Sequence, residues 1–263
     1  MNRFPPFIET ALQRAHSSWQ DILRQGLSAV EKNTPGYLDS LENTGFLPTQ
    51  GRLFAAFSLP VGQVRFVLMG EGPYPREASA SGYCFMDGAV QELWSADGLS
   101  KPVNRAVSLR NFIKMLLVAD GYLQPDDTGK DAMKRFVENS LKPDQTFIQT
   151  GQELQANMIH SGFLLLNAAL VFRKGVPAAK ETRYWQPFLN TVLEALAARQ
   201  ADQKLSVTLV LWGKMAERFQ SQFEGAGYRI AVSEHPYNLS FIGNGVMQSL
   251  FQPLNLLKKP LQR

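Results

Sequence analysis

The sequence predicts an α/β protein with three layers (α/β/α), in which helices cover both faces of a central, mostly parallel sheet of four strands. The first observation is that four short apolar runs, rich in branched and aromatic residues, have the length of buried strands; they lie at about residues 64–70, 163–167, 207–212 and 228–232. The second is that segments with helical periodicity separate these runs. Such alternation is typical of parallel sheets that helices cover on both sides.

The helices are predicted from apolar residues that recur on one face. An amphipathic pattern covers residues 7–32, and Pro35 and Gly36 end it. Two apolar stripes follow helical spacing within residues 109–117 and 185–196, and Ser108 is placed to cap the first of them. Shorter helices are expected at residues 131–139, 151–160, 214–224 and 245–258.

Two stretches lack such patterns. Residues 33–60 look like loops with short elements, and a loop rich in Gly, Ser, Pro and Asp extends from residue 71 to about 104. A loop of this length inside a domain is usually functional. Because no linker or internal repeat divides the chain, we expect one domain over residues 1–263, with residues 1–60 as a helical extension packed on it.

Composition narrows the class of protein. The 263 residues are 44% hydrophobic and 19% charged, which is ordinary for a globular protein. One cysteine, Cys84, excludes an internal disulfide and a cysteine-built zinc or iron–sulfur site, and the three histidines are widely spaced, so we expect no metal and no cofactor. The excess of 27 Lys and Arg over 23 Asp and Glu permits a polyanionic partner without requiring one. No signal peptide or membrane-length apolar run is seen, so a cytoplasmic setting is expected. A monomer is a separate expectation.

Polar residues stand at the ends of the predicted strands. Glu71, Asn167, Gly213 and His235 each follow or end one of the four apolar runs. The carboxyl ends of parallel strands lie at one edge of a sheet, and ligands bind there in open α/β folds. An Asn at a strand end is usually a turn former, and a His before Pro is usually structural. Together, however, the three polar residues among the four predict a polar cleft.

Six short segments carry a family resemblance. They are Gly-Glu-Gly-Pro-Tyr-Pro at 70–75, Gly-Tyr-Cys-Phe at 82–85, Val-Ser-Leu-Arg-Asn at 107–111, Leu-Leu-Leu-Asn at 164–167, Leu-Trp-Gly-Lys-Met-Ala at 211–216, and His-Pro-Tyr-Asn-Leu-Ser at 235–240. In this order they resemble the motifs of the uracil-DNA glycosylase superfamily, especially its classical branch, over about residues 60–257. The resemblance implies the fold of this superfamily. It also implies that the partner is DNA containing uracil or other damage. The implied reaction is base excision by hydrolysis of the N-glycosidic bond of uracil or a related pyrimidine.

The resemblance also implies roles for residues in a base pocket. An enzyme that acts on a base must extrude it from the stack. Phe85 would stack on the base, and the amide of Asn167 would pair with N3–H and O4 of uracil. Tyr74 would crowd out the methyl group of thymine, and Gly72 would lie in the same base-binding loop. His235 would donate a hydrogen bond to O2 of the departing uracil anion.

Three further residues match positions that grip DNA in the superfamily. Ser108 and Ser240 would contact phosphates, which position the duplex without reading its sequence. Leu239 would fill the gap that the extruded nucleotide leaves, as apolar wedges do in other DNA-bending proteins.

The loop at residues 70–75 departs from the classical Gly-Gln-Asp-Pro-Tyr-His. Glu71 replaces the Gln, Gly72 replaces the catalytic Asp, and Pro75 replaces the His. The superfamily's iron–sulfur branch has Gly-Glu-Ala-Pro-Gly here, with Glu as the catalytic residue, but it also has four cluster cysteines. The resemblance therefore implies Glu71 as general base and stabiliser of the cationic sugar.

Two alternatives remain open. One is a catalytically silent family member that binds DNA or an extruded base as a sensor or partner platform. The other is an α/β domain for a small phosphorylated ligand, which ranks last because the chain lacks the Gly-rich phosphate loop G-x-x-x-x-G-K-S/T.

Overall fold

A parallel four-stranded sheet flanked by helices forms the centre of the computed structural model, which describes residues 4–141, 146–203 and 206–260. The strand order is β4-β1-β5-β6. The strands are β1 (Phe66–Gly70), β4 (Phe163–Asn167), β5 (Thr208–Trp212) and β6 (Arg229–Ser233). The predicted α/β class and parallel sheet are confirmed, and each observed strand begins and ends within two residues of its expected position.

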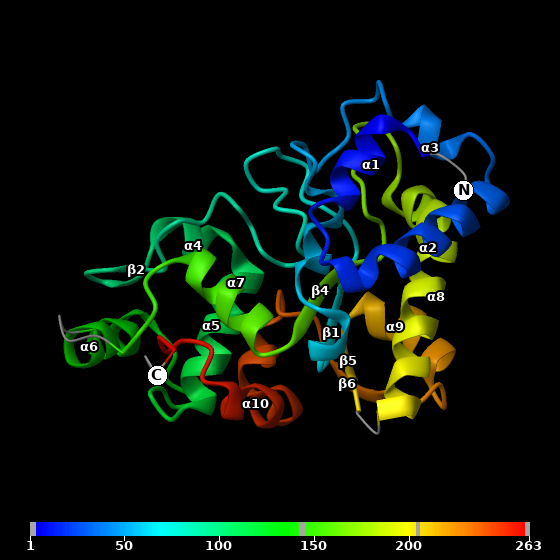
Figure 1. Ribbon diagram of the computed structural model, residues 1–263. Helices are drawn as coiled ribbons and strands as arrows, with labels where there is room; N and C mark the ends of the chain where they lie inside the picture. The colour runs from blue at the N-terminus through cyan, green and yellow to red at the C-terminus, as the bar shows by residue number, and fades with distance from the viewer. Residues whose placement is uncertain (1–3, 142–145, 204–205, 261–263) are drawn as a thin grey trace. The chain divides into compact units, whose positions relative to one another are not determined.

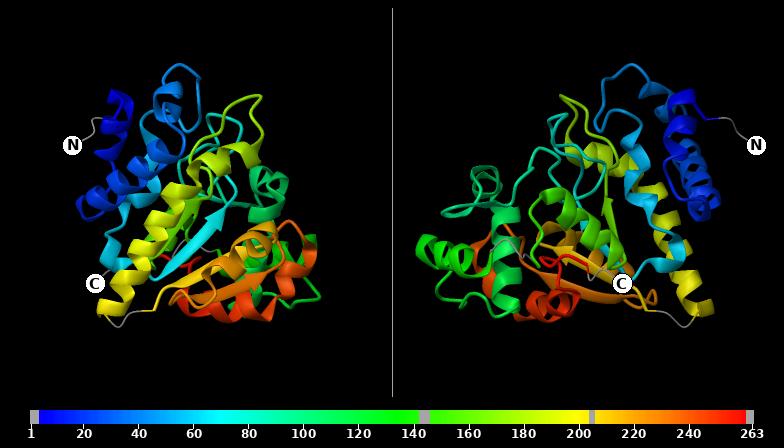
Figure 2. Two further views of the ribbon diagram at one scale, coloured as in Figure 1. Left: turned by 90° about the vertical axis from the view of Figure 1, so that its right-hand side faces the viewer. Right: turned by 60° about the vertical axis from the view of Figure 1, so that its left-hand side comes forward.

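The pair β1 and β4 runs parallel and in register from Phe66 opposite Phe163 to Gly70 opposite Asn167. The rings of Phe66 and Phe163 stack with their centroids 4.5 Å apart. All five residues of β4 are buried, which explains why these strands read as continuous apolar runs rather than alternating ones. In Figure 2, β1 (cyan) and β4 (green) lie side by side.

The described residues divide into two units. Unit 1 comprises the described parts of residues 1–87, 162–210 and 219–230, and unit 2 those of 88–161, 211–218 and 231–263. The structure does not test whether these units form the one domain expected over residues 1–263, which stays a prediction.

Unit 1 contains the N-terminal helices α1 (Pro6–Leu12), α2 (Gln20–Asn33) and α3 (Tyr37–Ser40), together with α8 (Ala178–Gln203). Helix α2 packs against α8 (Figure 1). A Cβ atom at Gly26 of α2 would come within 2.7 Å of the ring of Phe188 on α8, so the glycine permits close packing. Residues 1–60 also supply the 3₁₀ helices Ser17–Trp19 and Arg52–Ser58, and Val61–Gln63 follows.

Unit 2 holds most of the remaining helices. Helix α5 (Val107–Ala119) packs on α10 (Gly245–Phe251) and on the 3₁₀ helix Leu239–Gly243 (Figure 1). The unit also contains the short hairpin β2 (Trp94–Ser95) and β3 (Gly98–Leu99), α4 (Lys101–Arg105), α6 (Lys130–Ser140) and α7 (Gly151–His160). The division between the units passes through β5, α9 (Lys214–Phe223) and β6.

Several predicted helices differ from those observed. The helix expected at 7–32 is broken because His16 takes an extended conformation and its ring accepts the backbone N–H of Ser18, which starts a new helical turn. The helix expected at 245–258 ends at Phe251, and a 3₁₀ turn containing Pro253 follows, because proline has no N–H to continue an α-helix. Ser108 does not cap α5: the helix begins at Val107, so Ser108 lies in its first turn.

The loop expected from residue 71 to 104 is not wholly irregular, since it contains the β2–β3 hairpin and α4. Its strands are only two residues long, too short to give an alternating pattern in the sequence. Within the described residues, no helix combines the length and the apolar character needed to cross a membrane.

Candidate functional site

In unit 1, the candidate residues begin where β1 and β4 end together. Gly70 closes β1 opposite Asn167, and a Cβ atom at Gly70 would lie 2.6 Å from Oδ1 of Asn167 and 2.8 Å from Cβ of Cys84. Any side chain at position 70 would therefore push Asn167 out of place. The absence of a side chain at Gly70 is a requirement of the site that the sequence alone did not indicate.

Asn167 carries an unusual feature for a buried amide. Its side chain is 6% exposed, and Oδ1 has no hydrogen-bond partner among the described residues. Leaving a buried acceptor unpaired costs about 1–3 kcal/mol, and such atoms in native structures commonly have a functional reason. The geometry provides an acceptor that is ready for an incoming N–H donor.

Glu71 follows directly after β1. Its backbone carbonyl accepts the N–H of Ala169 at 3.0 Å, which ties the start of the loop to the segment after β4. The side chain, by contrast, is exposed, and none of the described residues forms a hydrogen bond or ion pair with its carboxylate. The carboxylate is therefore free to take up a position set by a substrate.

Gly72 leaves room beside this carboxylate. A Cβ atom at Gly72 would meet only Ala169, at 3.6 Å from both its Cβ and its carbonyl oxygen, which is ordinary van der Waals contact. The backbone at position 72 therefore tolerates a side chain. The glycine leaves space in the loop, but the backbone conformation does not require a glycine at this position.

Tyr74 and Phe85 are linked by a hydrogen bond. The hydroxyl group of Tyr74 donates to the backbone carbonyl of Phe85 at 3.1 Å. Burial, together with the nearby Asp87 and Cys84, raises the pKa of Tyr74 well above its usual value, so the phenol stays neutral and remains a donor at physiological pH. Both side chains are half-buried, so each keeps an accessible surface.

The backbone of Phe85 is in the left-handed region, with φ of 65°. Non-glycine residues seldom adopt this conformation, and those that do are concentrated at functional sites. The preceding residue holds it there: the N–H of Cys84 donates to Leu165 of β4 at 3.0 Å, and its thiol contacts the carbonyl of Leu68 of β1 at 3.1 Å. Burial raises the pKa of the Cys84 thiol, so this cysteine is an anchor rather than a nucleophile.

In unit 2, the candidate residues lie at the ends of β5 and β6. Gly213 has φ of 52°, its N–H donates to Ser233 at 2.9 Å, and a Cβ atom there would lie 2.9 Å from Cβ of His235. Nδ1 of His235 accepts the backbone N–H of Tyr237 at 3.0 Å. A neutral ring in this arrangement carries its proton on Nε2, so the exposed imidazole is preset as a donor.

Asn111 holds the segment that follows His235. This side chain, 1% exposed on α5, donates through Nδ2 to the carbonyls of Pro236 at 2.8 Å and of Tyr237 and Asn238 at 3.4 Å. Asn111 belongs to the motif at residues 107–111 but is not among the predicted site residues. A polar residue on an otherwise apolar helix face was the available signal.

Leu239 and Tyr237 project from this segment with 69% and 66% of their surface exposed. Glu234 precedes His235, and Nδ2 of Asn244 donates to its carboxylate at 2.8 Å. Burial acts to raise the pKa of Glu234, but hydrogen bonds from Ser240 and Asn244 outweigh it and lower the pKa below its usual value. Ser240 is thus hydrogen-bonded to a carboxylate of its own segment.

The predicted residues divide between the two units. Unit 1 contains the predicted base-binding set and Glu71, and unit 2 contains His235 and the predicted DNA contacts Ser108, Leu239 and Ser240. Ser108 is half-buried in the first turn of α5. Among the described residues, no group of three or more His, Cys, Asp or Glu could hold a metal ion.

Comparisons with known proteins show what the chain is similar to. No family model matches the chain. A uracil-DNA glycosylase from Corynebacterium glutamicum is 30% identical over 227 residues, covering 86% of this chain and 81% of that protein, and one from a Mycobacterium species (strain KMS) is 28% identical over 195 residues, covering 74% and 68%.

Solved structures give the same result. The UNG crystal structure from Nitratifractor salsuginis superposes with a TM-score of 0.85 at 38% identity, over 99% of this chain and 100% of that one. The mimivirus uracil-DNA glycosylase, at 18% identity and a TM-score of 0.59, shares the fold over 99% of this chain and 94% of its own. On these similarities, the chain belongs to the uracil-DNA glycosylase family.

Proposed function

We propose that this protein hydrolyses the N-glycosidic bond of uracil, or of a related pyrimidine, in DNA, as an enzyme of base-excision repair. The observation that carries the proposal is the unpaired, buried Oδ1 of Asn167 beside Gly70. N3–H of uracil would satisfy this acceptor, and Nδ2 of the same amide would donate to O4. Cytosine has an acceptor at N3 and a donor at C4, so it would leave these groups unpaired and be rejected.

The other pocket residues complete base selection. Phe85 would stack on the extruded ring, and Tyr74 would stand against C5, where it would exclude the methyl group of thymine. The hydrogen bond from Tyr74 to the carbonyl of Phe85 supports this assignment, because it fixes both residues relative to one another. Gly72 would leave the approach to the base open.

Bond cleavage separates charge. As the bond between C1′ and N1 breaks, its electron pair leaves with the base as a uracil anion, and the sugar becomes a cation. The Nε2–H of His235 would stabilise the developing charge on O2. Glu71 would stabilise the cationic sugar and accept a proton from the water whose oxygen bonds to C1′. The open carboxylate of Glu71 supports this role.

Contacts to DNA are proposed for Ser108, Leu239 and Ser240. The exposure of Leu239 fits a wedge that enters the stack. Binding of a phosphate by Ser240 would replace its hydrogen bond to Glu234. We also propose that the enzyme acts as a cytoplasmic monomer without metal or cofactor; the single cysteine supports a reducing compartment.

The test is release of free uracil from a single-uracil oligonucleotide under single-turnover conditions. We expect release by the wild type, and a rate lower by about 10²–10⁴-fold for Glu71→Gln, the range for loss of a general base. Asn167→Ala should instead weaken binding of the uracil-containing strand. Absence of release by the wild type would contradict the proposal and support the alternative, a catalytically silent family member. The relatives, which are named uracil-DNA glycosylases, do not favour that alternative.

A further inference from the structure

One cavity in unit 1 has no part in the proposed base excision. Its volume is about 330 Å³, and it is lined by residues of the segment 34–40, the loop after β4 and helix α8: Thr34, Pro35, Gly36, Tyr37, Ser40, Arg173, Val176, Lys180 and Tyr184. Two of these residues are cationic, two are tyrosines, and Thr34 and Ser40 add aliphatic hydroxyl groups.

The arginine in this cavity is held rigidly from one side. Nε of Arg173 donates to Oε1 of Glu181 at 2.5 Å, and the hydroxyl group of Tyr37 donates to Oε2 at 2.6 Å. Glu181 is 2% exposed, so both its oxygens are occupied inside the protein. Among the described residues, no acceptor bonds the two terminal amino groups of Arg173, which leaves the planar edge that binds phosphate in a bidentate manner.

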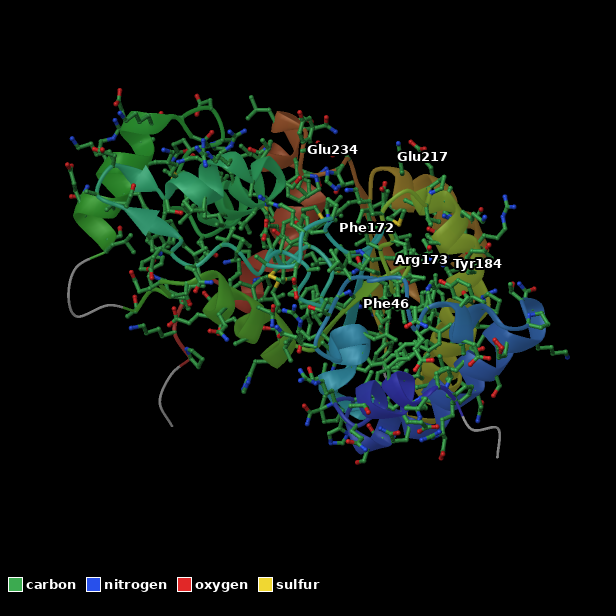
Figure 3. The ribbon with its side chains drawn as sticks, turned by 90° about the horizontal axis from the view of Figure 1, so that it is seen from above. Phe46, Phe172, Arg173, Tyr184, Glu217 and Glu234 are labelled. Carbon is green, nitrogen blue, oxygen red and sulfur yellow. The ribbon has the colours of Figure 1, made fainter. Side chains whose placement is uncertain are left out.

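Aromatic rings form the adjoining wall. Tyr37 and Tyr184 stack at 4.3 Å between centroids, the guanidinium of Arg173 lies 5.4 Å from the centroid of Tyr37, and Nζ of Lys180 lies 5.9 Å from that of Tyr184. Figure 3 shows Arg173 beside Tyr184. A half-buried tyrosine next to two cations offers a stacking surface for a ring and charge for an anion.

The charge balance favours an anion. The segment 173–184 carries four cationic side chains and one carboxylate, Glu181, which is already paired. The other nearby carboxylate, Glu31, accepts the backbone N–H groups of Gly36 and Leu38. Lys180 is exposed and makes no ion pair within the described chain, so its charge is available to a ligand.

We propose that this cavity is a nucleotide subsite, in which Arg173 and Lys180 bind a phosphate group and Tyr184 stacks on the attached base. The phosphate belongs either to a strand of DNA or to a free mononucleotide. The subsite does not depend on base release or on Asn167.

Binding of thymidine 5′-monophosphate and of inorganic phosphate, measured by calorimetry, tests the proposal. An Asn167→Ala background removes the predicted base pocket and should leave binding of both probes unchanged. Lys180→Gln should weaken both probes, whereas Tyr184→Ala should weaken the mononucleotide by about fivefold or more through lost stacking and leave phosphate unaffected. Tyr184→Phe keeps the ring and should restore mononucleotide binding.

Lys174→Gln is the matched control, because Lys174 is exposed on the same segment but does not line the cavity. It should bind both probes like the wild type. Equal weakening by Lys174→Gln and Lys180→Gln would show diffuse attraction and overturn the subsite, as would a complete lack of mononucleotide binding or its loss in the Asn167→Ala background.

A uracil-free single strand identifies the source of the phosphate. If it is DNA, Lys180→Gln should reduce the slope of log K against log salt by about 0.7, the value for one phosphate contact on a single strand. If only the mononucleotide responds to Lys180→Gln, the subsite takes a free nucleotide. Either result supports the subsite.

Discussion

The segments that follow β1 and β6 both begin with a glutamate, and they treat it in opposite ways. The carboxylate of Glu71 has no partner among the described residues, whereas that of Glu234 is held by Ser240 and Asn244. The segment after β6 is also tied by Asn111 and by the bond between His235 and the N–H of Tyr237. The comparison indicates that hydrogen bonds within the protein already position the side chains of Glu234 and His235 after β6. The carboxylate of Glu71 after β1 depends on substrate for its position.

The largest expected effect on the rate of uracil release comes from removing the carboxylate of Glu71 and then restoring one at the next residue. Glu71→Gln should lower uracil release by about 10²–10⁴-fold, and adding Gly72→Asp should recover part of that loss, because a side chain at position 72 meets only van der Waals contacts. Single-turnover release measures both. Glu77→Gln, an exposed glutamate in the same loop, is the control and should leave the rate unchanged. Equal rates for the single and double variants would show that position 72 does not face the sugar.

Removing the preset donor should have the next largest effect. His235→Ala should lower the rate of release by about 10²–10³-fold, the cost of losing one hydrogen bond to a developing oxyanion, with little change in binding of uracil-containing DNA. His160→Ala, the same change at an exposed helix end, is the matched control. A normal rate for His235→Ala would remove His235 from the mechanism.

Loosening the segment after β6 should have a smaller effect. Asn111→Ala leaves the buried carbonyl of Pro236 without its donor, which should lower the free energy of unfolding by about 1–3 kcal/mol. It should also slow uracil release, because His235 and Leu239 lose their support. Denaturant unfolding and single-turnover kinetics measure the two effects. Asn139→Ala, at an exposed position on α6, should change neither; a slow rate for that variant would make the effect unspecific.

The smallest expected effect concerns acid stability. Hydrogen bonds lower the pKa of Glu234 in the folded state despite its partial burial, so the charged form stabilises the fold. This contribution is present above the unfolded pKa of about 4.3 and is lost as the pH falls through the lower folded value. Glu234→Gln should therefore flatten the dependence of thermal stability on pH below about 4.5. An unchanged pH profile would mean that these hydrogen bonds do not favour the charged carboxylate.

The sequence by itself determined the strands, most helices and the chemical types at the site. Strand 163–167 and helix 151–160 were predicted with their observed ends, because apolar runs and helical stripes are local patterns that burial enforces. The motifs around Glu71, Asn167 and His235 were likewise readable, since each lies within a few residues of a strand end.

Only the tertiary structure decided how these groups are held. The contact of Asn111 with Pro236 joins residues 125 positions apart, and that of Tyr37 with Glu181 joins residues 144 apart. No periodicity of one segment encodes such a pair, because the partner is chosen by packing of the whole chain. The unpaired Oδ1 of Asn167, the space kept by Gly70 and the cavity beside Arg173 follow from the same cause: each is a property of segments brought together by folding.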